Sequence, residues 1–393
     1  MSAALLGQSA TRPAQRNFPV PDALRSVAIW ESPDFLGSWG AVSAIAAEEH
    51  RNYPGKCDVF GHAAYSVRGL FEHGKLAAIT VVVLDAGAWF GFVPDSEAKK
   101  IAATKGPQFT ALYKQTVADV ERGLAGLAGG AGRKVIFVEK GLLKQDALIH
   151  HAGDLWIRLT TIENQLVKFT VTRSEADATS PLSAQRRIAK KEEQSREFTS
   201  RVSTAPNGDR LLDGIPIFTQ GDRAYCGVAT LAMAMQFLGL RLDTEDFAGP
   251  AGIRFGSTYH SNIREVFTAA AEVAKLKMPS TTQFDFEKAR VAIDGGCPVI
   301  VFRRWSQERD FLHGAVALRI QDDPAVTLPK PDLKDRKSWP TRDNYAHSSL
   351  ITGYHLARRE LIFTESWGER TRNRRMRIEE MEGTAYLTYY PRL

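Results

Sequence analysis

The sequence predicts an α+β protein of two domains, each containing an antiparallel sheet. Three observations predict this. The chain has 393 residues, more than the ~100 to 200 of a typical domain. Two groups of short β-rich runs each accompany apolar stretches of helical period, and a charged segment separates the groups. With 44% hydrophobic and 24% charged residues, the chain has the composition of a globular protein with buried cores.

The first predicted domain spans residues 19–175, after an N-terminal tail of residues 1–18. Residues 58–85 contain two β-rich runs separated by Glu-His-Gly-Lys, in which the glycine favours a hairpin turn. Residues 109–127 follow a helical period, which a pair of glycines ends. Further strand-like runs lie at residues 134–140 and 154–173. This domain is therefore expected to be an α+β accessory domain.

Residues 176–210 are predicted to be a charged linker, because they contain few large apolar residues. One solvated helix is expected near residues 184–198. Arg186 and Arg187 within it could form a protease-sensitive site or a patch for an acidic partner, but a solvated helix face is the favoured interpretation.

The second predicted domain spans residues 211–393. Residues 226–240 are apolar nearly all round, which is typical of a helix buried in a core, and Gly239 is suited to its C-terminal cap. A second helix is expected at residues 261–276. Short strand-like runs follow at residues 297–305, 313–320, 347–355, 360–366 and 384–390. The pattern predicts a buried N-terminal helix packed on an antiparallel sheet.

Composition excludes several classes of protein. No apolar run reaches the ~18 to 20 residues of a membrane span. A net charge of +6 is mild for this length, so no nucleic-acid partner is predicted. The three cysteines form no CxxC pair, and the His150-His151 pair has no supporting carboxylates, so neither a metal nor another cofactor is expected. The start lacks the basic residues of a complete signal peptide, which leaves secreted, periplasmic and cytoplasmic locations open.

Cys226 stands where a helix could activate it. The thiolate is the reactive form of cysteine, and the partial positive charge at a helix N-terminus favours it. Gln220, in the loop just before, is placed to donate its side-chain amide to an oxyanion. Such a site also needs a histidine base whose ring a polar group holds in place.

Three motifs occur in the order that such a site requires. They are Gln-x5-Cys-Gly at residues 220–227, a strand-like run that begins with His347 and contains Gly353-Tyr354, and Glu-Ser-Trp-Gly at residues 365–368. Over residues 214–390 this pattern resembles the papain-like cysteine peptidases. It is most similar to their bacterial C39-like relatives, which are related to the bacteriocin-processing peptidases. The resemblance implies a papain-like fold and a peptidase that forms an acyl-enzyme.

The resemblance also implies a role for each matched residue. Gln220 would be the oxyanion donor, Cys226 the nucleophile and His347 the general base and acid. Glu365 stands where the family has Asn or Asp, and Trp367 would shield the histidine from water. The sequence departs from the family pattern in two places. Residues 226–230 read Cys-Gly-Val-Ala-Thr, so the local disulfide of papain is absent, and Glu365 is one methylene longer than Asp.

Other interpretations of these residues stay open. A cysteine at a helix start is often a small core residue, and Cys57 and Cys297 are expected to have no catalytic role. His313 is the rival base, although no Gly-Tyr or acid-Ser-Trp-Gly follows it at the right distance. His260 is expected in a turn or cap. The arginine-rich residues 369–377 are predicted to form a solvated loop near the rim of the site.

The sequence thus predicts a cysteine peptidase that acts on a peptide or protein substrate through a thioester on Cys226. Transglutaminases, amidases and acyltransferases use the same intermediate, so they are alternatives, as is a non-catalytic peptide-binding module. The N-terminal domain is expected to regulate the site by masking the cleft or to help present the substrate, and an unrelated accessory role is the other possibility.

Overall fold

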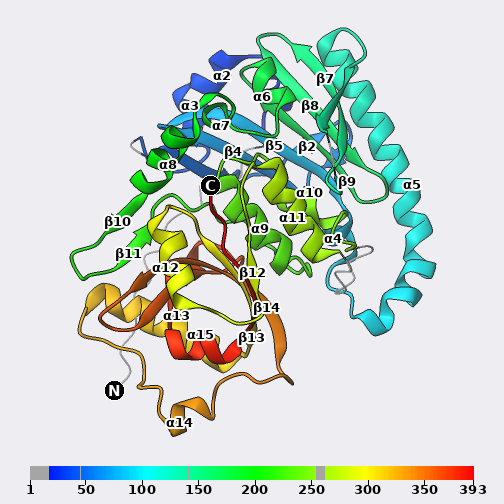
Figure 1. Ribbon diagram of the computed structural model, residues 1–393. Coiled ribbons are helices and arrows are strands. Elements are labelled where there is room, and N and C mark those ends of the chain that lie inside the picture. The colour runs from blue at the N-terminus through cyan, green and yellow to red at the C-terminus, as the bar shows by residue number, and fades with distance from the viewer. Residues whose placement is uncertain (1–16, 45, 140, 254–261) are drawn as a thin grey trace, which may run out of the picture.

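Two antiparallel sheets with helices between them form the core of the protein, which confirms the α+β class. The structure is a computed structural model that describes residues 17–44, 46–139, 141–253 and 262–393. Figure 1 shows the first sheet at the top, the second at the bottom, and helices α9, α10 and α11 between them. The N-terminal unit contains α1 (Val20–Ala23), α2 (Val27–Glu31), α3 (Pro33–Gly37), β1 (Glu48–Asn52), β2 (Asp58–Val59), β3 (His62–Ala63), β4 (Ser66–Glu72), β5 (Lys75–Asp85), α4 (Ala86–Phe90), α5 (Asp95–Ala128), β6 (Arg133–Val138), β7 (Gln145–Ala152), β8 (Leu155–Ile162) and β9 (Leu166–Thr172).

The seven strands of the first sheet have the order β1-β4-β5-β9-β8-β7-β6. The predicted hairpin is confirmed as β4 and β5, in which Glu72 pairs with Lys75. His73 and Gly74 between them have φ values of 48° and 75°, as a two-residue turn between twisted strands requires. The predicted helix is also present, but α5 begins earlier, at Asp95, where Asp95 and Glu97 place acidic side chains in the first turn.

The two faces of this sheet differ in polarity because neighbouring residues of a strand point to opposite sides. On β9, Val167, Phe169 and Val171 belong to a buried apolar cluster that includes residues of α5. The opposite face carries Lys168 and Thr170. Both of these side chains are buried as well, so the polar face is covered by another part of the protein.

The segment predicted as a charged linker is folded. It forms α6 (Glu175–Thr179), α7 (Ala184–Ile188), α8 (Lys191–Ser200) and β10 (Val202–Thr204). Arg186 is only 4% exposed, and its guanidinium donates to the backbone oxygen of Ala274. It lies over Gly239, where an added Cβ would be 2.3 Å from Arg186 Cγ. Helices α7 and α8 are otherwise largely exposed, as predicted for a solvated helix, and only Arg186 and Phe198 in them are buried. The burial of Arg186 is thus the one departure from the predicted solvated face, and the positions of the domain boundaries stay predictions.

The second sheet has the order β10-β11-β14-β13-β17-β12, and β15 pairs with β14 and β16. Helix α9 packs on β14 and β13, as the sequence predicts for a buried helix on a sheet. The elements are β11 (Arg210–Leu212), α9 (Cys226–Phe237), α10 (Thr244–Ala248), α11 (Ile263–Val273), β12 (Ser280–Thr281), α12 (Phe286–Asp294), β13 (Val299–Trp305), α13 (Gln307–Asp322), α14 (Leu333–Arg336), β14 (Tyr345–His355), β15 (Glu360–Thr364), the 3₁₀ helix η1 (Glu369–Thr371), β16 (Arg374–Arg377), α15 (Ile378–Thr384) and β17 (Ala385–Tyr389).

Two predictions in this region were wrong. Residues 313–320 are not a strand but part of α13, in which Val316 and Ile320 lie one turn apart in a small apolar cluster. The arginine-rich segment is not a solvated loop, because its second half forms β16. Arg375 is 6% exposed and forms ion pairs with Asp209 and Glu360.

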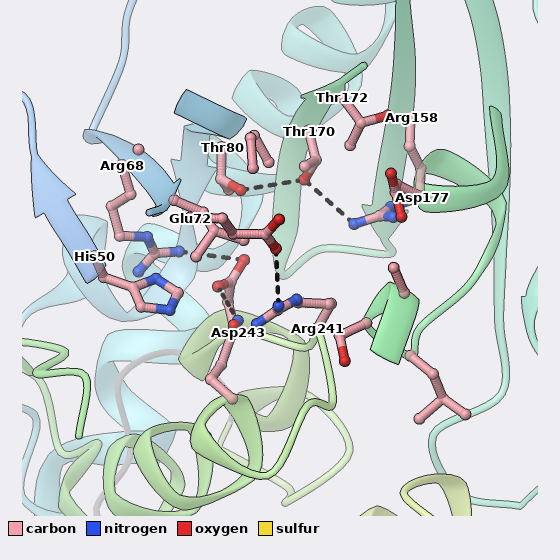
Figure 2. A pocket seen from close by; sticks show the side chains of 18 residues that line it. His50, Arg68, Glu72, Thr80, Arg158, Thr170, Thr172, Asp177, Arg241 and Asp243 are labelled. Atoms are coloured by element: carbon pink, nitrogen blue, oxygen red, sulfur yellow. Dashed lines mark hydrogen bonds and ion pairs between the residues drawn. The ribbon is translucent and has the colours of Figure 1, made fainter. Parts of the chain in front are cut away.

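Acidic residues at the start of α10 cover the polar face of the first sheet. Lys168 Nζ lies 2.7 Å from Asp243 Oδ2 and also binds Asp246. Arg68 Nη2 lies 2.9 Å from Glu245 Oε2. These five side chains are called the interface cluster below. A cavity of about 100 Å³ lies beside them (Figure 2), and Arg68 and Asp243 contribute to its wall. In the described ranges, no helix has the length and apolar character that a bilayer crossing demands.

Candidate active site

Cys226 is the first residue of α9, at the end of a loop formed by residues 219–225. Its side chain is partly exposed, whereas the rest of the helix, residues 227–237, is buried. An added Cβ on Gly227 would be 3.2 Å from the Phe302 ring of β13, so the helix start packs closely on the sheet. Backbone N–H groups in a first helical turn have no partner within the helix and favour a negative charge at Cys226.

His347 lies on β14, opposite Arg303 of β13. Its side chain is 6% exposed, and it lies close enough to the thiol of Cys226 for each group to shift the pKa of the other. A second contact fixes the helix against this strand: Thr230 Oγ1, one turn after the cysteine, lies 2.6 Å from Ser348 Oγ. The helix that carries the thiol and the strand that carries the imidazole are thus joined next to both functional groups.

Glu365 follows β15, and its carboxylate is fully buried. Oε2 lies 2.8 Å from His347 Nε2. Oε1 accepts hydrogen bonds from Arg303 Nη2 and Ser349 Oγ, each at 2.8 Å. The longer glutamate side chain therefore reaches the imidazole, and two further donors satisfy its second oxygen.

The electrostatics of the three groups favour a thiolate beside an imidazolium. Burial raises the pKa of Cys226, but the hydrogen bond and charge of His347 and the N–H groups of Ser348 and Gly227 more than offset it, so this pKa is lowered. Burial lowers the pKa of His347, whereas Glu365 and Cys226 raise it to about 9. Burial likewise raises the pKa of Glu365, and His347 and Arg303 lower it to about 2.

Gln220 is held by the segment that contains the acid. Its side-chain oxygen accepts a hydrogen bond of 2.6 Å from Ser366 Oγ, and its backbone N–H donates to the Ser366 carbonyl at 2.8 Å. Its side-chain nitrogen donates to the Arg223 carbonyl at 3.2 Å. A primary amide has two N–H groups, so this bond leaves one further donor in the loop that precedes Cys226.

Trp367 stacks on the imidazole of His347, with ring centroids 4.4 Å apart and an angle of 23° between the planes. Trp305 packs against the edge of this stack, 5.7 Å from Trp367. An aromatic face stabilises a cation placed over it. The stack therefore covers one face of His347 and favours its protonated form.

The other candidates named from the sequence lie elsewhere. His313 is fully buried on α13, and its Nε2 lies 3.1 Å from Glu380. Burial raises the pKa of both Cys57 and Cys297 to about 12, in contrast to Cys226. His260 lies outside the described residues. Within the ranges that the structure describes, no group of three or more His, Cys, Asp or Glu side chains could hold a metal ion.

The sequence interpretation missed Arg303, Ser349, Thr230 and Ser366. Ser349 and Ser366 each lie within two residues of a named candidate, which is a weak signal of a supporting role. Arg303 had no such signal, because only the pairing of β13 with β14 brings it opposite His347. Its burial beside an acid follows from that register.

The site combines a cysteine at the start of a helix, a histidine on a strand and an acid that binds this histidine. This is the arrangement expected from the resemblance of the sequence to the papain-like cysteine peptidases. Residues 212–392 match the model of the Peptidase_C39 like family. This region is a little under half of the chain. It starts at the last residue of β11 and contains strands β12 to β17 of the second sheet. The resemblance to the C39-like peptidases is therefore confirmed for this region.

Comparisons beyond the family are distant. A crystal structure described as that of a C39-like peptidase from Bacillus anthracis has 16% identity and a TM-score of 0.30, and the match covers 47% of this chain and 98% of that one. The peptidase domain of Streptococcus ComA, a bifunctional ABC transporter involved in a quorum-sensing pathway, has 16% identity and a TM-score of 0.28, with 44% and 96% covered. None of the curated proteins matches the sequence.

Proposed function

We propose that the protein is a peptidase that hydrolyses peptide bonds through a thioester on Cys226, with His347 as general base and acid. One observation carries the proposal. A partly exposed thiol of lowered pKa lies beside an imidazole of raised pKa, and Glu365 binds Nε2 of that imidazole at 2.8 Å. A nucleophile, its base and an orienting acid in series are what acyl transfer requires.

Acylation begins from the ion pair. The thiolate sulfur of Cys226 attacks the carbonyl carbon of the scissile peptide, and the carbonyl oxygen becomes an oxyanion. Gln220 and the backbone N–H of Cys226 are the donors proposed to stabilise it. As the C–N bond breaks, the imidazolium of His347 gives its proton to the leaving amine. The products are a free amine and a thioester, with His347 neutral.

Deacylation reverses these roles. Neutral His347 removes a proton from water, whose oxygen attacks the thioester carbon. When the C–S bond breaks, the sulfur leaves as a thiolate and the histidine remains protonated, so the ion pair is restored. Each cycle consumes one peptide bond and one water molecule and yields one carboxylic acid and one amine. Glu365 keeps Nε2 of His347 hydrogen-bonded throughout, which holds the other nitrogen toward the sulfur.

The test is removal of the sulfur. Cys226→Ala should abolish hydrolysis of a peptide library while the thermal unfolding temperature stays close to that of the unchanged protein, because the side chain is small and partly exposed. Cys297→Ala is the matched control and should retain activity, since that thiol is buried in the core. Peptide cleavage by Cys226→Ala above background would refute the proposal.

The acceptor of the acyl group can be measured in the same assay. Mass spectrometry should detect a covalent adduct on Cys226 during turnover, and the released product should be a free acid. If a labelled amine added with the peptide is incorporated in preference to water, the protein is a transferase that uses the same thioester.

A further inference from the structure

Asp85, at the end of β5 in the N-terminal unit, contacts the loop that carries the nucleophile. It lies outside the region that matches the peptidase family. Its side chain is 1% exposed. Oδ2 accepts hydrogen bonds from the Ala88 backbone N–H at 2.8 Å and from Arg223 Nη1 at 3.2 Å. Oδ1 accepts one from the Tyr225 hydroxyl at 3.0 Å. One carboxylate thus binds two residues of the loop 219–225.

Arg223 transmits this contact to the backbone around Gln220. Its Nε donates to the Gln220 carbonyl at 2.7 Å, and Nη2 donates to the Thr219 carbonyl at 2.9 Å. Its remaining nitrogen, Nη1, binds Asp85 and also Glu245 Oε1 at 3.0 Å. A guanidinium is a rigid, planar fork, so fixing one edge with two carboxylates fixes the loop carbonyls bound to the other edge.

Tyr225 transmits the contact to the start of the helix, because it directly precedes Cys226. Its ring is fully buried, and its hydroxyl accepts a hydrogen bond of 3.1 Å from Gln165 Nε2. Gly87 lies directly against the ring, since an added Cβ there would be 2.4 Å from both Cζ and the hydroxyl oxygen. Three residues of the N-terminal unit therefore determine where the phenol group lies.

We propose that Asp85 is a positioning residue for the nucleophile loop, so that the N-terminal unit completes the active site of the peptidase domain. The inference rests on the proposed function. It differs from masking of the cleft and from substrate presentation, because Asp85 acts on the enzyme's own loop through Arg223 and Tyr225. A displacement of about 1 Å in a reacting group can reduce a rate by about a hundredfold, so a contact this far from the substrate can affect turnover.

The first test variant is Asp85→Asn in the full chain. Asparagine caps a helix as well as aspartate does, so the bond to the N-terminus of α4 is retained while the charge that holds Arg223 is lost. We expect kcat on a fluorogenic peptide to fall by about ten- to a hundredfold with little change in KM. The pH midpoint for alkylation of Cys226 by iodoacetamide, followed by mass spectrometry, should rise, because a displaced helix start no longer pairs the thiol with His347.

Tyr225→Phe is the second variant, and it removes a single hydroxyl group, so it serves even if Asp85→Asn fails to fold. It should lower kcat and raise the alkylation midpoint in the same direction. Gln145→Ala is the matched control: it deletes a contact between the same two units, Gln145 Nε2 to Asp246 Oδ1 at 3.2 Å, that does not touch the loop. It should keep kcat and the midpoint of the unchanged protein.

The outcomes separate this inference from the proposed function. If the unchanged protein cleaves peptides and Tyr225→Phe keeps both kcat and the alkylation midpoint, Asp85 is not a positioning residue. If Gln145→Ala loses as much activity as Tyr225→Phe, general loosening of the interface explains the effect and the inference also fails. If the unchanged protein cleaves no peptide and Cys226 reacts no faster than Cys57 and Cys297, the proposed function itself fails.

Discussion

The candidate active site and the interface cluster contain the same kinds of group in different surroundings. In both, buried carboxylates bind buried cations: Glu365 with Arg303 in the first, and Asp243 and Asp246 with Lys168 in the second. The pKa of Glu365 is lowered to about 2, and so is that of Glu245 in the interface cluster. Strong pKa shifts and deep burial therefore do not distinguish a reactive site from a structural one.

The candidate active site and the interface cluster differ in the group that ends each series of hydrogen bonds and ion pairs. In the candidate active site, the carboxylate is followed by an imidazole and then by a thiol that is partly exposed. In the interface cluster, the cation Lys168 is bound by two carboxylates and is 1% exposed. A thiol that solvent can reach makes the first arrangement the one suited to the proposed catalysis.

The largest expected effect concerns stability, and it tests whether the ion pairs of Lys168 in the interface cluster are structural. Lys168→Met should lower the free energy of unfolding by about 3 to 5 kcal/mol, because it leaves Asp243 and Asp246 buried without their shared cation. Urea denaturation measures this. Activity per folded molecule should be unchanged.

The matched control is Lys134→Met, which removes an ion pair to Asp146 between largely exposed side chains. Its unfolding midpoint should remain close to that of the unchanged protein. Equal midpoints for the two variants would show that the buried cluster contributes no more to folding stability than a surface ion pair does. The interface cluster would then not be a stabilising structural element.

The next effect concerns catalysis alone. Gln220→Ala should lower kcat by roughly 10² to 10³, the usual consequence of losing one oxyanion donor, with no loss of folding stability, since the side chain is only half-buried. Asp222→Ala is the control, because it alters an exposed side chain in the same loop. If steady-state kinetics give both variants a kcat within a few-fold of the unchanged protein, Gln220 is not the donor.

The smallest effect is a change in pH dependence. The proposed mechanism needs Cys226 ionised and His347 protonated. Activity should therefore rise with pH as the thiol ionises and fall as pH passes through about 9, where His347 loses its proton. Glu365→Gln removes the charge that raises this pKa, so the upper limit should move to lower pH.

The glutamine variant should retain part of the activity, because its carbonyl can still accept from His347, whereas Glu365→Ala should retain less. In Glu365→Gln, the amide nitrogen of the new glutamine would face the donors Arg303 and Ser349, which adds to the loss of activity. A kcat/KM profile measured from pH 5 to pH 10 provides the check. If the upper limit stays at the same pH in Glu365→Gln, another group sets the pKa of His347.

The sequence was most informative where a local pattern suffices. The apolar run after Cys226 predicts α9, and the β-rich runs predict β4, β5, β13, β14 and β15. Residues 313–320 do not predict α13, because their apolar residues fit either period and the start signal of the helix, Ser306 capping Arg309 N–H, lies several residues before that run. Short apolar runs of this kind do not distinguish strand from helix.

The supporting residues of the site depend on long-range structure. Arg303 reaches Glu365 because β13 and β14 pair in one register, and no local signal reveals that register. The interface was missed for a related reason. Alternation on β9 predicts a polar face, and such a face ordinarily meets water, whereas here Asp243 and Asp246 cover it from more than seventy residues away.

The polar face of the first sheet also has a consequence for the order of synthesis. Every strand of that sheet, from Glu48 to Thr172, is made before the segment that begins at Asp243. Until that segment emerges from the ribosome, Arg68 and Lys168 meet water. A face of leucines at this stage would be a site for aggregation, whereas Arg68 and Lys168 can be hydrated, so this part of the face does not depend on its partner to avoid association.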